Sequence, residues 1–237
     1  MAPPNGPQLL LRLAQQRPVP TLSPTPAVSA HPADVLEQVP VVLRAGLSAE
    51  QADQLRAVLT VLPPYTRASL NGLLSKGDPV LLQRDTLGQT MLGRLYELLT
   101  QPLDAAFQAE GIGRPDILLS VLTEVIDPGS IDQSFKTTCA ATTLEYLLAR
   151  QNPAELVRLV TGLVSPLASV VLANKDTLRR VKDSVAYDNS GRSISERVFQ
   201  SAVMDSAKPG RYRNVSDCLK LNFGFMTVRH QGTLGMK

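Results

Sequence analysis

Apolar residues recur at helical spacing through most of the chain, and this periodicity limits the fold class more tightly than any other feature. The clearest case begins at Ser48, which forms the S-x-x-Q pattern of a capping box with Gln51. Four apolar residues then share one helix face before Pro63 and Pro64 end the run. They are Leu55, Val58, Leu59 and Leu62. By the same pattern, we expect helices over residues 33–45, 48–62, 66–75, 79–84, 86–99, 102–110 and 115–126.

The later part of the chain repeats these helix signals and adds a β signal. Asn152 is followed by Pro153 and Glu155, which together predict a capped helix start. Residues 169–181 change to a strand-like pattern with a polar turn in the middle, which predicts a short hairpin. Ser193 and Glu196 form a second capping box, and the helix that they start is expected to bury four residues. These are Val198, Phe199, Ala202 and Val203. The pattern also predicts one further strand, over Phe223–Val228.

The amino-terminal residues differ in composition from the rest of the chain. Residues 1–32 are rich in proline and serine, and they contain too little apolar surface to offset the entropy of ordering, so we expect a disordered tail. No cleavable signal pattern is present. The expected location is therefore the cytoplasm, with export by a route that needs no cleavable signal, as for many bacterial effectors, as the alternative.

The overall composition excludes several classes of protein. The net charge is only +3, and the chain has no Trp, 5 Tyr and 5 Phe, so neither a basic patch nor an aromatic stacking platform for nucleic acid is indicated. No apolar run is long enough for a transmembrane helix. Neither GxxxxGK[ST] nor GxGxxG occurs, and two cysteines are too few for a thiolate metal site. We therefore predict no cofactor, no metal, no nucleic acid and no membrane partner.

The residues around Cys139 carry the best candidate chemistry. A turn at Asp127-Pro128-Gly129 leads into polar residues, and a helical pattern begins at or beside Cys139. Leu144, Leu147 and Leu148 lie on one face of that helix. The N–H groups at the start of a helix stabilise negative charge and so favour the nucleophilic thiolate form of a cysteine. Gln133, six residues earlier, can supply an amide donor to an oxyanion that forms beside the sulfur.

This arrangement resembles the nucleophile segment of papain-like cysteine peptidases, over about twenty residues. The resemblance implies that Cys139 is the nucleophile, that Gln133 builds the oxyanion hole, and that a histidine after the cysteine is the base. His230 is the candidate in that order, because His31 lies in the predicted disordered tail. The family also has glycines, a second cysteine and an aromatic residue around the nucleophile. Ser134, Thr137, Thr138 and Ala140 stand in those places here.

Two functional hypotheses follow from these residues. The first is a papain-like cysteine hydrolase or peptidase that acts on a peptide or amide bond of a protein or peptide substrate. Its site is expected to be incomplete or inactive if no third residue orients His230, because no Asn or Asp follows that histidine and the β half of the family looks truncated. The second hypothesis is a non-catalytic helical interaction module, or an exported bacterial effector, in which Cys139 only packs.

The predicted organisation therefore has three parts. A disordered Pro/Ser-rich tail covers residues 1–32, a helical region covers residues 33–126, and a cysteine-hydrolase-like segment covers residues 127–237. The predicted fold class is mainly α (α+β): a helical N-terminal bundle followed by a helix-rich papain-like segment with a short β-hairpin.

Overall fold

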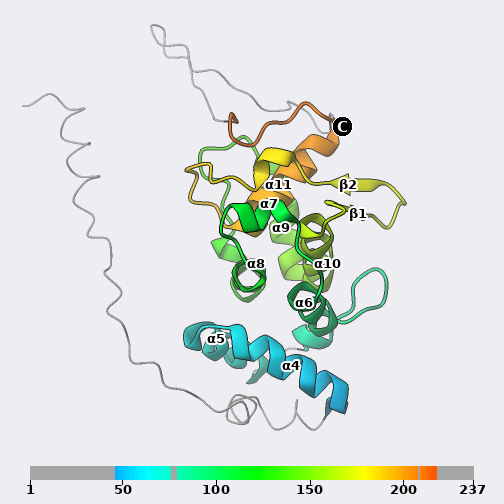
Figure 1. Ribbon diagram of the computed structural model, residues 1–237. Coiled ribbons are helices and arrows are strands. Elements are labelled where there is room, and N and C mark those ends of the chain that lie inside the picture. Colours follow the sequence, from blue (N-terminus) through cyan, green and yellow to red (C-terminus); the bar gives the residue numbers. More distant parts are fainter. Residues whose placement is uncertain (1–45, 76–78, 208, 218–237) are drawn as a thin grey trace, which may run out of the picture. The chain divides into compact units, whose positions relative to one another are not determined.

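The computed structural model describes residues 46–75, 79–207 and 209–217, and within them the chain is mostly helical (Figure 1). A two-stranded antiparallel sheet is the only sheet in this part of the chain. The predicted mainly α (α+β) fold class is therefore confirmed. The helix predicted over 33–45 and the strand predicted over Phe223–Val228 lie outside the described residues.

The first described helices follow the predicted capping signals closely. Helix α4 (Ala49–Val61) begins after Ser48, whose hydroxyl accepts from the Gln51 backbone N–H at 3.2 Å while the Gln51 side chain accepts from the Ser48 N–H at 2.9 Å. Helix α5 (Pro64–Ser75) begins almost at once, because proline suits the first turn of a helix. Both helices bury one face, as their periodicity predicts.

Two predicted helices in the next stretch are wrong in extent. Residues 79–84 contain only a short 3-10 turn, η1 (Val80–Leu82). The helix predicted over 86–99 is α6 (Met91–Thr100), which starts later. The physical reason is Asp85, whose carboxylate accepts from the backbone N–H groups of Leu87 and Gln89 and so holds a turn there.

The remaining helices match their predicted positions with small shifts at the ends. Helix α7 (Ala105–Ala109) is shorter than predicted because Asp104 caps it. Helix α8 (Arg114–Ile126) agrees with the prediction. Helix α9 (Cys139–Gln151) begins at the cysteine itself, and α10 (Pro153–Val164) begins after Asn152, whose side chain accepts from the Glu155 N–H at 3.1 Å.

The predicted hairpin and the last predicted helix are also present. Strands β1 (Ser169–Val171) and β2 (Thr177–Arg179) pair in antiparallel register, with Val170 opposite Leu178. A 3-10 turn, η3 (Lys182–Ser184), follows. Helix α11 (Ile194–Ala207) buries all four predicted apolar residues.

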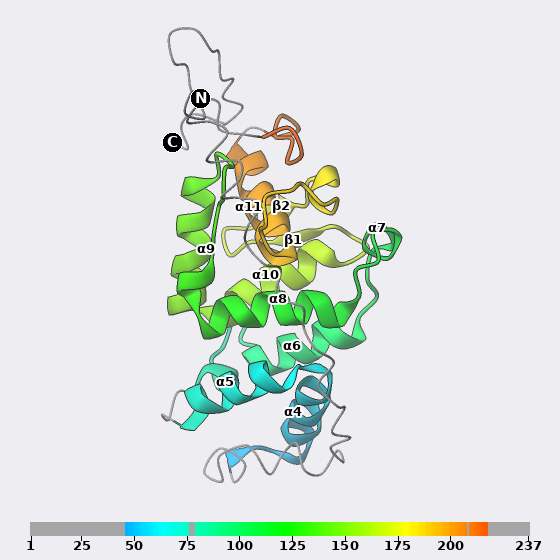
Figure 2. The same cartoon turned by 90° about the vertical axis from the view of Figure 1, so that its left-hand side faces the viewer.

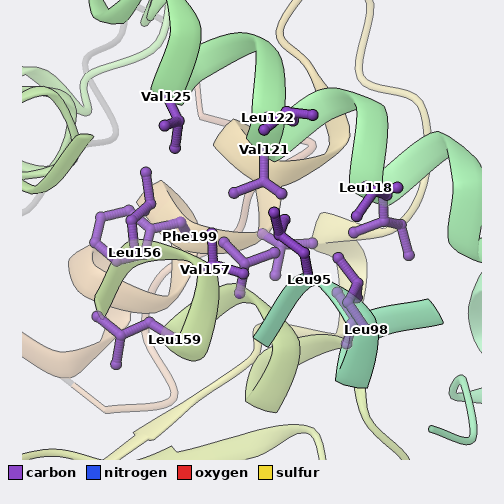
Figure 3. Packing of buried hydrophobic residues seen from close by; sticks show 14 of the residues in the cluster. Leu95, Leu98, Leu118, Val121, Leu122, Val125, Leu156, Val157, Leu159 and Phe199 are labelled. Carbon is purple, nitrogen blue, oxygen red and sulfur yellow. The ribbon is translucent and has the colours of Figure 1, made fainter. Parts of the chain in front are cut away.

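Helix α10 is the centre of the described core. All its residues except Gly162 are buried, and it contacts α6, α8, α9 and α11, which surround it in Figure 2. Apolar side chains from four helices meet here, as Figure 3 shows. Those labelled are Leu95 and Leu98 of α6, Leu118, Val121, Leu122 and Val125 of α8, Leu156, Val157 and Leu159 of α10, and Phe199 of α11.

Helix α9 buries a face other than the one on which Leu144 and Leu147 lie. Leu144 and Leu147 are exposed at 42% and 41%, whereas Ala141, Glu145 and Ala149 form the buried face. Alanines at i and i+8 leave room for close contact with α11, and Glu145 between them has a hydrogen-bond partner on that helix. The leucine periodicity was therefore a poor guide to which face of α9 is inside.

Candidate active site

Cys139 is exposed and is the first residue of α9. The first N–H groups of a helix have no partner within the helix. The side chain of the N-cap residue Thr138 does not hydrogen-bond to them, since its hydroxyl donates to Gln200 Oε1 at 2.8 Å instead. The sulfur therefore lies at a helix start that its own N-cap side chain does not cover, which is the environment that the sequence predicted.

Gln133 is half-buried on the segment that precedes Cys139. Its side-chain Nε2 donates to the Lys136 carbonyl at 3.4 Å, which is a long hydrogen bond. This is its one side-chain hydrogen bond among the described residues. Gln133 and Cys139 thus belong to one short segment, but the amide points at that segment's own backbone and makes no hydrogen bond to the sulfur.

The predicted base cannot be placed with the other two residues. His230 lies outside the described residues, as do His31 and the second cysteine, Cys218. The described chain therefore brings together only Cys139 and Gln133 of the three predicted site residues.

The two carboxylates near the turn have local structural roles. Asp127 Oδ1 accepts from the Gly129 N–H at 3.1 Å, and Asp132 Oδ1 accepts from the Ser134 N–H at 2.8 Å. Ser134 itself has a positive φ of 54°. These contacts are Asx-type turns, which are sufficient to explain why aspartates occur at these positions.

Side chains from distant parts of the sequence hold the segment 132–138 by hydrogen bonds. The Asp132 N–H donates to Glu196 Oε1 at 2.6 Å, and the Asp132 carbonyl accepts from Gln200 Nε2 at 3.0 Å. Further along, the Thr137 hydroxyl donates to Asp217 Oδ1 at 2.6 Å, and the Thr137 N–H donates to Asp217 Oδ2 at 3.0 Å. Both ends of the segment that leads to Cys139 are therefore tied to the folded core.

A buried ionic cluster supports the same segment. Lys136 is wholly buried, and its Nζ donates to the Asn214 carbonyl at 2.7 Å and lies 3.4 Å from Asp188 Oδ2. Arg192 is also wholly buried and contacts the same carboxylate oxygen at 2.7 Å. Burial alone would raise the pKa of Asp188, but hydrogen bonds from Ser190 and Arg192 outweigh burial and hold that pKa well below its ordinary value. The Asp188 carboxylate thus forms ion pairs with two buried cations, Lys136 and Arg192.

Three buried glutamates, Glu124, Glu145 and Glu196, lie close to one another. Burial, together with the nearby Glu196 carboxylate, raises the pKa of Glu124 to about 8, although the hydrogen bond from the Ser195 hydroxyl opposes the shift. Burial also raises the pKa of Glu145 well above its ordinary value, and that of Glu196 in the same direction. Oε2 of Glu124 and Oε1 of Glu145 have no hydrogen-bond partner among the described residues. A protonated carboxyl group fits both positions.

The sequence reasoning missed these supporting residues. Lys136 belongs to the candidate segment, and Asp188 and Gln200 contact that segment from distant positions in the chain. Arg192 in turn contacts Asp188 and Gln200. A usable signal was Glu145, a charged residue between two alanines spaced four residues away on each side, which marks a small-residue face suited to close packing.

Comparisons with known proteins give no relative for this chain. No protein-family model, no curated protein and no solved structure matches it. Within residues 46–75, 79–207 and 209–217, no helix is long and apolar enough to cross a membrane. No group of three or more His, Cys, Asp or Glu that could hold a metal ion occurs in that same part of the chain.

Proposed function

We propose that the protein is a cysteine hydrolase, similar to papain-like enzymes, which acts on a peptide or amide bond. The observation that carries this proposal is the position of Cys139, which is exposed at the first residue of a 13-residue helix, on a segment fastened at both ends. A buried cysteine, as core packing requires, would not support it. Exposure is needed because the sulfur must reach the carbonyl carbon of a substrate.

The proposed chemistry is nucleophilic acyl transfer. The Cys139 thiolate attacks the substrate carbonyl, and the resulting oxyanion accepts hydrogen bonds from the Cys139 backbone N–H and from the Gln133 side chain. Collapse of this intermediate expels the amine, which takes a proton from the general acid, and leaves an acyl group on the sulfur. Water then attacks the thioester, releases the acid and restores the thiol. His230 is the proposed acid and base.

Gln133 must turn for this role. In the structure its amide contacts the Lys136 carbonyl at 3.4 Å, and a contact of that length is weak and easily exchanged. Catalytic hydrogen bonds are often long or misaligned before substrate binds. The proposal therefore requires the half-buried Gln133 side chain, which lies next to Asp132 on the anchored segment, to change its rotamer.

The experiment is acylation of the full chain by p-nitrophenyl acetate, followed by intact-mass and peptide mass spectrometry. We expect a rapid release of about one equivalent of p-nitrophenolate and an acetyl group on Cys139. Cys139→Ala should abolish this burst, whereas Cys218→Ser should leave it unchanged. If the burst persists in Cys139→Ala, or if Cys139 is acylated no faster in the native chain than in urea, the proposal is wrong.

A second candidate function is supported by one specific observation. Leu144 and Leu147 are exposed apolar residues on α9, the same helix that begins at Cys139. An exposed apolar strip on a helix suits a protein-interaction module, in which Cys139 has no chemical role. Loss of a binding partner on Leu147→Ser, together with no acylation of Cys139, would favour this function. Export as a bacterial effector stays a prediction from the amino-terminal composition.

A further inference from the structure

Gln200 connects the candidate site to the core. It lies on α11, is fully buried, and uses every hydrogen-bonding position of its side-chain amide. Its Nε2 donates to the Asp132 carbonyl at 3.0 Å and to Glu145 Oε2 at 2.8 Å. Its Oε1 accepts from the Thr138 hydroxyl at 2.8 Å and from Arg192 Nη1 at 3.0 Å. Two of these four partners are the two ends of the segment 132–138.

The two ends held by Gln200 adjoin the two proposed oxyanion donors. Asp132 immediately precedes Gln133, and Thr138 immediately precedes Cys139, whose backbone N–H is the second donor. A single amide that hydrogen-bonds to both neighbours fixes the backbone at Gln133 relative to the Cys139 N–H. The other two partners, Glu145 of α9 and Arg192, fix the amide itself, since both are buried.

We propose that Gln200 is a positioning residue for the oxyanion hole, an inference that rests on the proposed function. It touches neither substrate nor sulfur. It acts through Asp132 and Thr138, and it sets where Gln133 and the Cys139 N–H lie when the oxyanion forms. Preorganised donors of this kind act only where charge develops in the transition state.

The prediction is that Gln200 affects acylation but not alkylation of Cys139. Acylation by an ester passes through an oxyanion, whereas alkylation by iodoacetamide is a direct displacement at carbon that forms none. Gln200→Glu keeps an oxygen to accept from Thr138 and Arg192, but as a carboxylate it cannot donate to the Asp132 carbonyl. The substitution therefore breaks the bonds to Asp132 and to Glu145, and it leaves the contacts to Thr138 and Arg192 in place.

We expect Gln200→Glu to slow acylation of Cys139 by p-nitrophenyl acetate at least about tenfold, because removal of one oxyanion donor typically costs about a hundredfold or more. Alkylation by iodoacetamide should stay within about twofold of wild type. Ile117→Val, a buried change in α8 away from the segment, is the control for general destabilisation and should leave both rates unchanged.

Each outcome has a separate meaning. Equal acylation rates for wild type and folded Gln200→Glu would overturn the positioning role, and so would parallel changes in acylation and alkylation. If wild type itself is not acylated, the proposed function fails rather than this inference alone. Should circular dichroism show that Gln200→Glu does not fold, Thr138→Val removes the other grip. It is then expected to slow acylation at least about threefold without a matching change in alkylation, and equal acylation would again refute the role.

Discussion

Replacement of Glu124 by glutamine should make the protein less sensitive to alkaline pH. Glu124 is fully buried on α8, and one of its oxygens accepts from the hydroxyls of Ser193 and Ser195. Because burial raises its pKa to about 8 from an ordinary value of 4.5, the carboxyl group is protonated in the folded protein at neutral pH. Glutamine mimics this neutral form.

The sign and the size of the effect follow from linkage. A carboxyl group with a raised folded-state pKa contributes stability that is full below pH 4.5 and is lost as the pH rises towards 8. For one proton, the free energy of unfolding changes by about 1.4 kcal/mol per pH unit between the two pKa values, so it falls by about 4 kcal/mol from pH 5 to 8. The pKa values of Glu145 and Glu196 are also raised, so the stability of the wild type falls more steeply as the pH rises.

Urea unfolding followed by circular dichroism at pH 5, 6.5 and 8 measures this effect directly. Glu124→Gln should nearly equal wild type at pH 5 and exceed it by about 4 kcal/mol at pH 8. Glu110→Gln, at an exposed position, is the control and should run parallel to wild type. If the free energies of unfolding of Glu124→Gln and wild type stay parallel across this range, Glu124 is not a buried neutral acid and the reasoning is wrong.

Three further predictions test other parts of the structure. Asp188→Asn leaves two buried cations without their carboxylate and should lower the free energy of unfolding at pH 7 by about 3–5 kcal/mol, as measured in urea. It should also remove the loss of stability that wild type shows as the pH falls below 3.8, the ordinary pKa of an aspartate. An unchanged free energy of unfolding at pH 7 would contradict the cluster. Gly162→Ala brings a Cβ to 2.6 Å from the Val170 side chain of β1 and should lower the free energy of unfolding by about 1–3 kcal/mol. Gly72→Ala, in an open helical position, should raise it by about 0.5–1 kcal/mol. Thermal melts that rank the two variants in the opposite order would refute the α10–β1 packing. Leu147→Ala, at an exposed position, should lower the free energy of unfolding by under about 1 kcal/mol, and Leu156→Ala, at a buried one, by about 2–5 kcal/mol. Equal losses would mean that the orientation of α9 is wrong.

Local signals in the sequence predicted most of the helix starts. The cap pairs at Ser48, Asn152 and Ser193 all act in the structure as their spacing predicts. These signals work because a cap satisfies N–H groups within three residues, so both partners are visible in one short stretch of sequence. The hairpin over 169–181 was predictable for the same reason, since its turn and its register are local.

Longer-range features were not predictable in the same way. The apolar period placed the leucines of α9 together but could not show that Ala141 and Ala149 pack inside instead, because that choice depends on α11. The Asp85 carboxylate accepts from two backbone N–H groups and so holds a turn where the apolar period predicted a helix. Helix α6 therefore begins later than predicted. The contacts of Gln200 with Asp132, Thr138 and Glu145 connect residues more than fifty positions apart, and no periodicity in the sequence indicates them.

For the candidate site, the sequence identified the segment but not its support. Cys139 lies at a helix start, as the helical pattern after the turn predicted, and the structure shows in addition that it is exposed. Gln133 shares its segment but faces the Lys136 carbonyl, because a side-chain rotamer depends on its immediate neighbours and not on spacing. His230 lies outside the described residues, so its role as base stays a prediction.

The reactivity of Cys139 towards iodoacetamide at pH 6 tests the central claim most directly. Peptide mass spectrometry of the full chain gives separate rates for Cys139 and Cys218, in the native state and in urea. If Cys139 is the nucleophile, it should react at least about threefold faster in the native chain than in urea, and faster than Cys218. Slow and equal labelling of both cysteines, or faster labelling of Cys139 in urea, would contradict its assignment as a nucleophile.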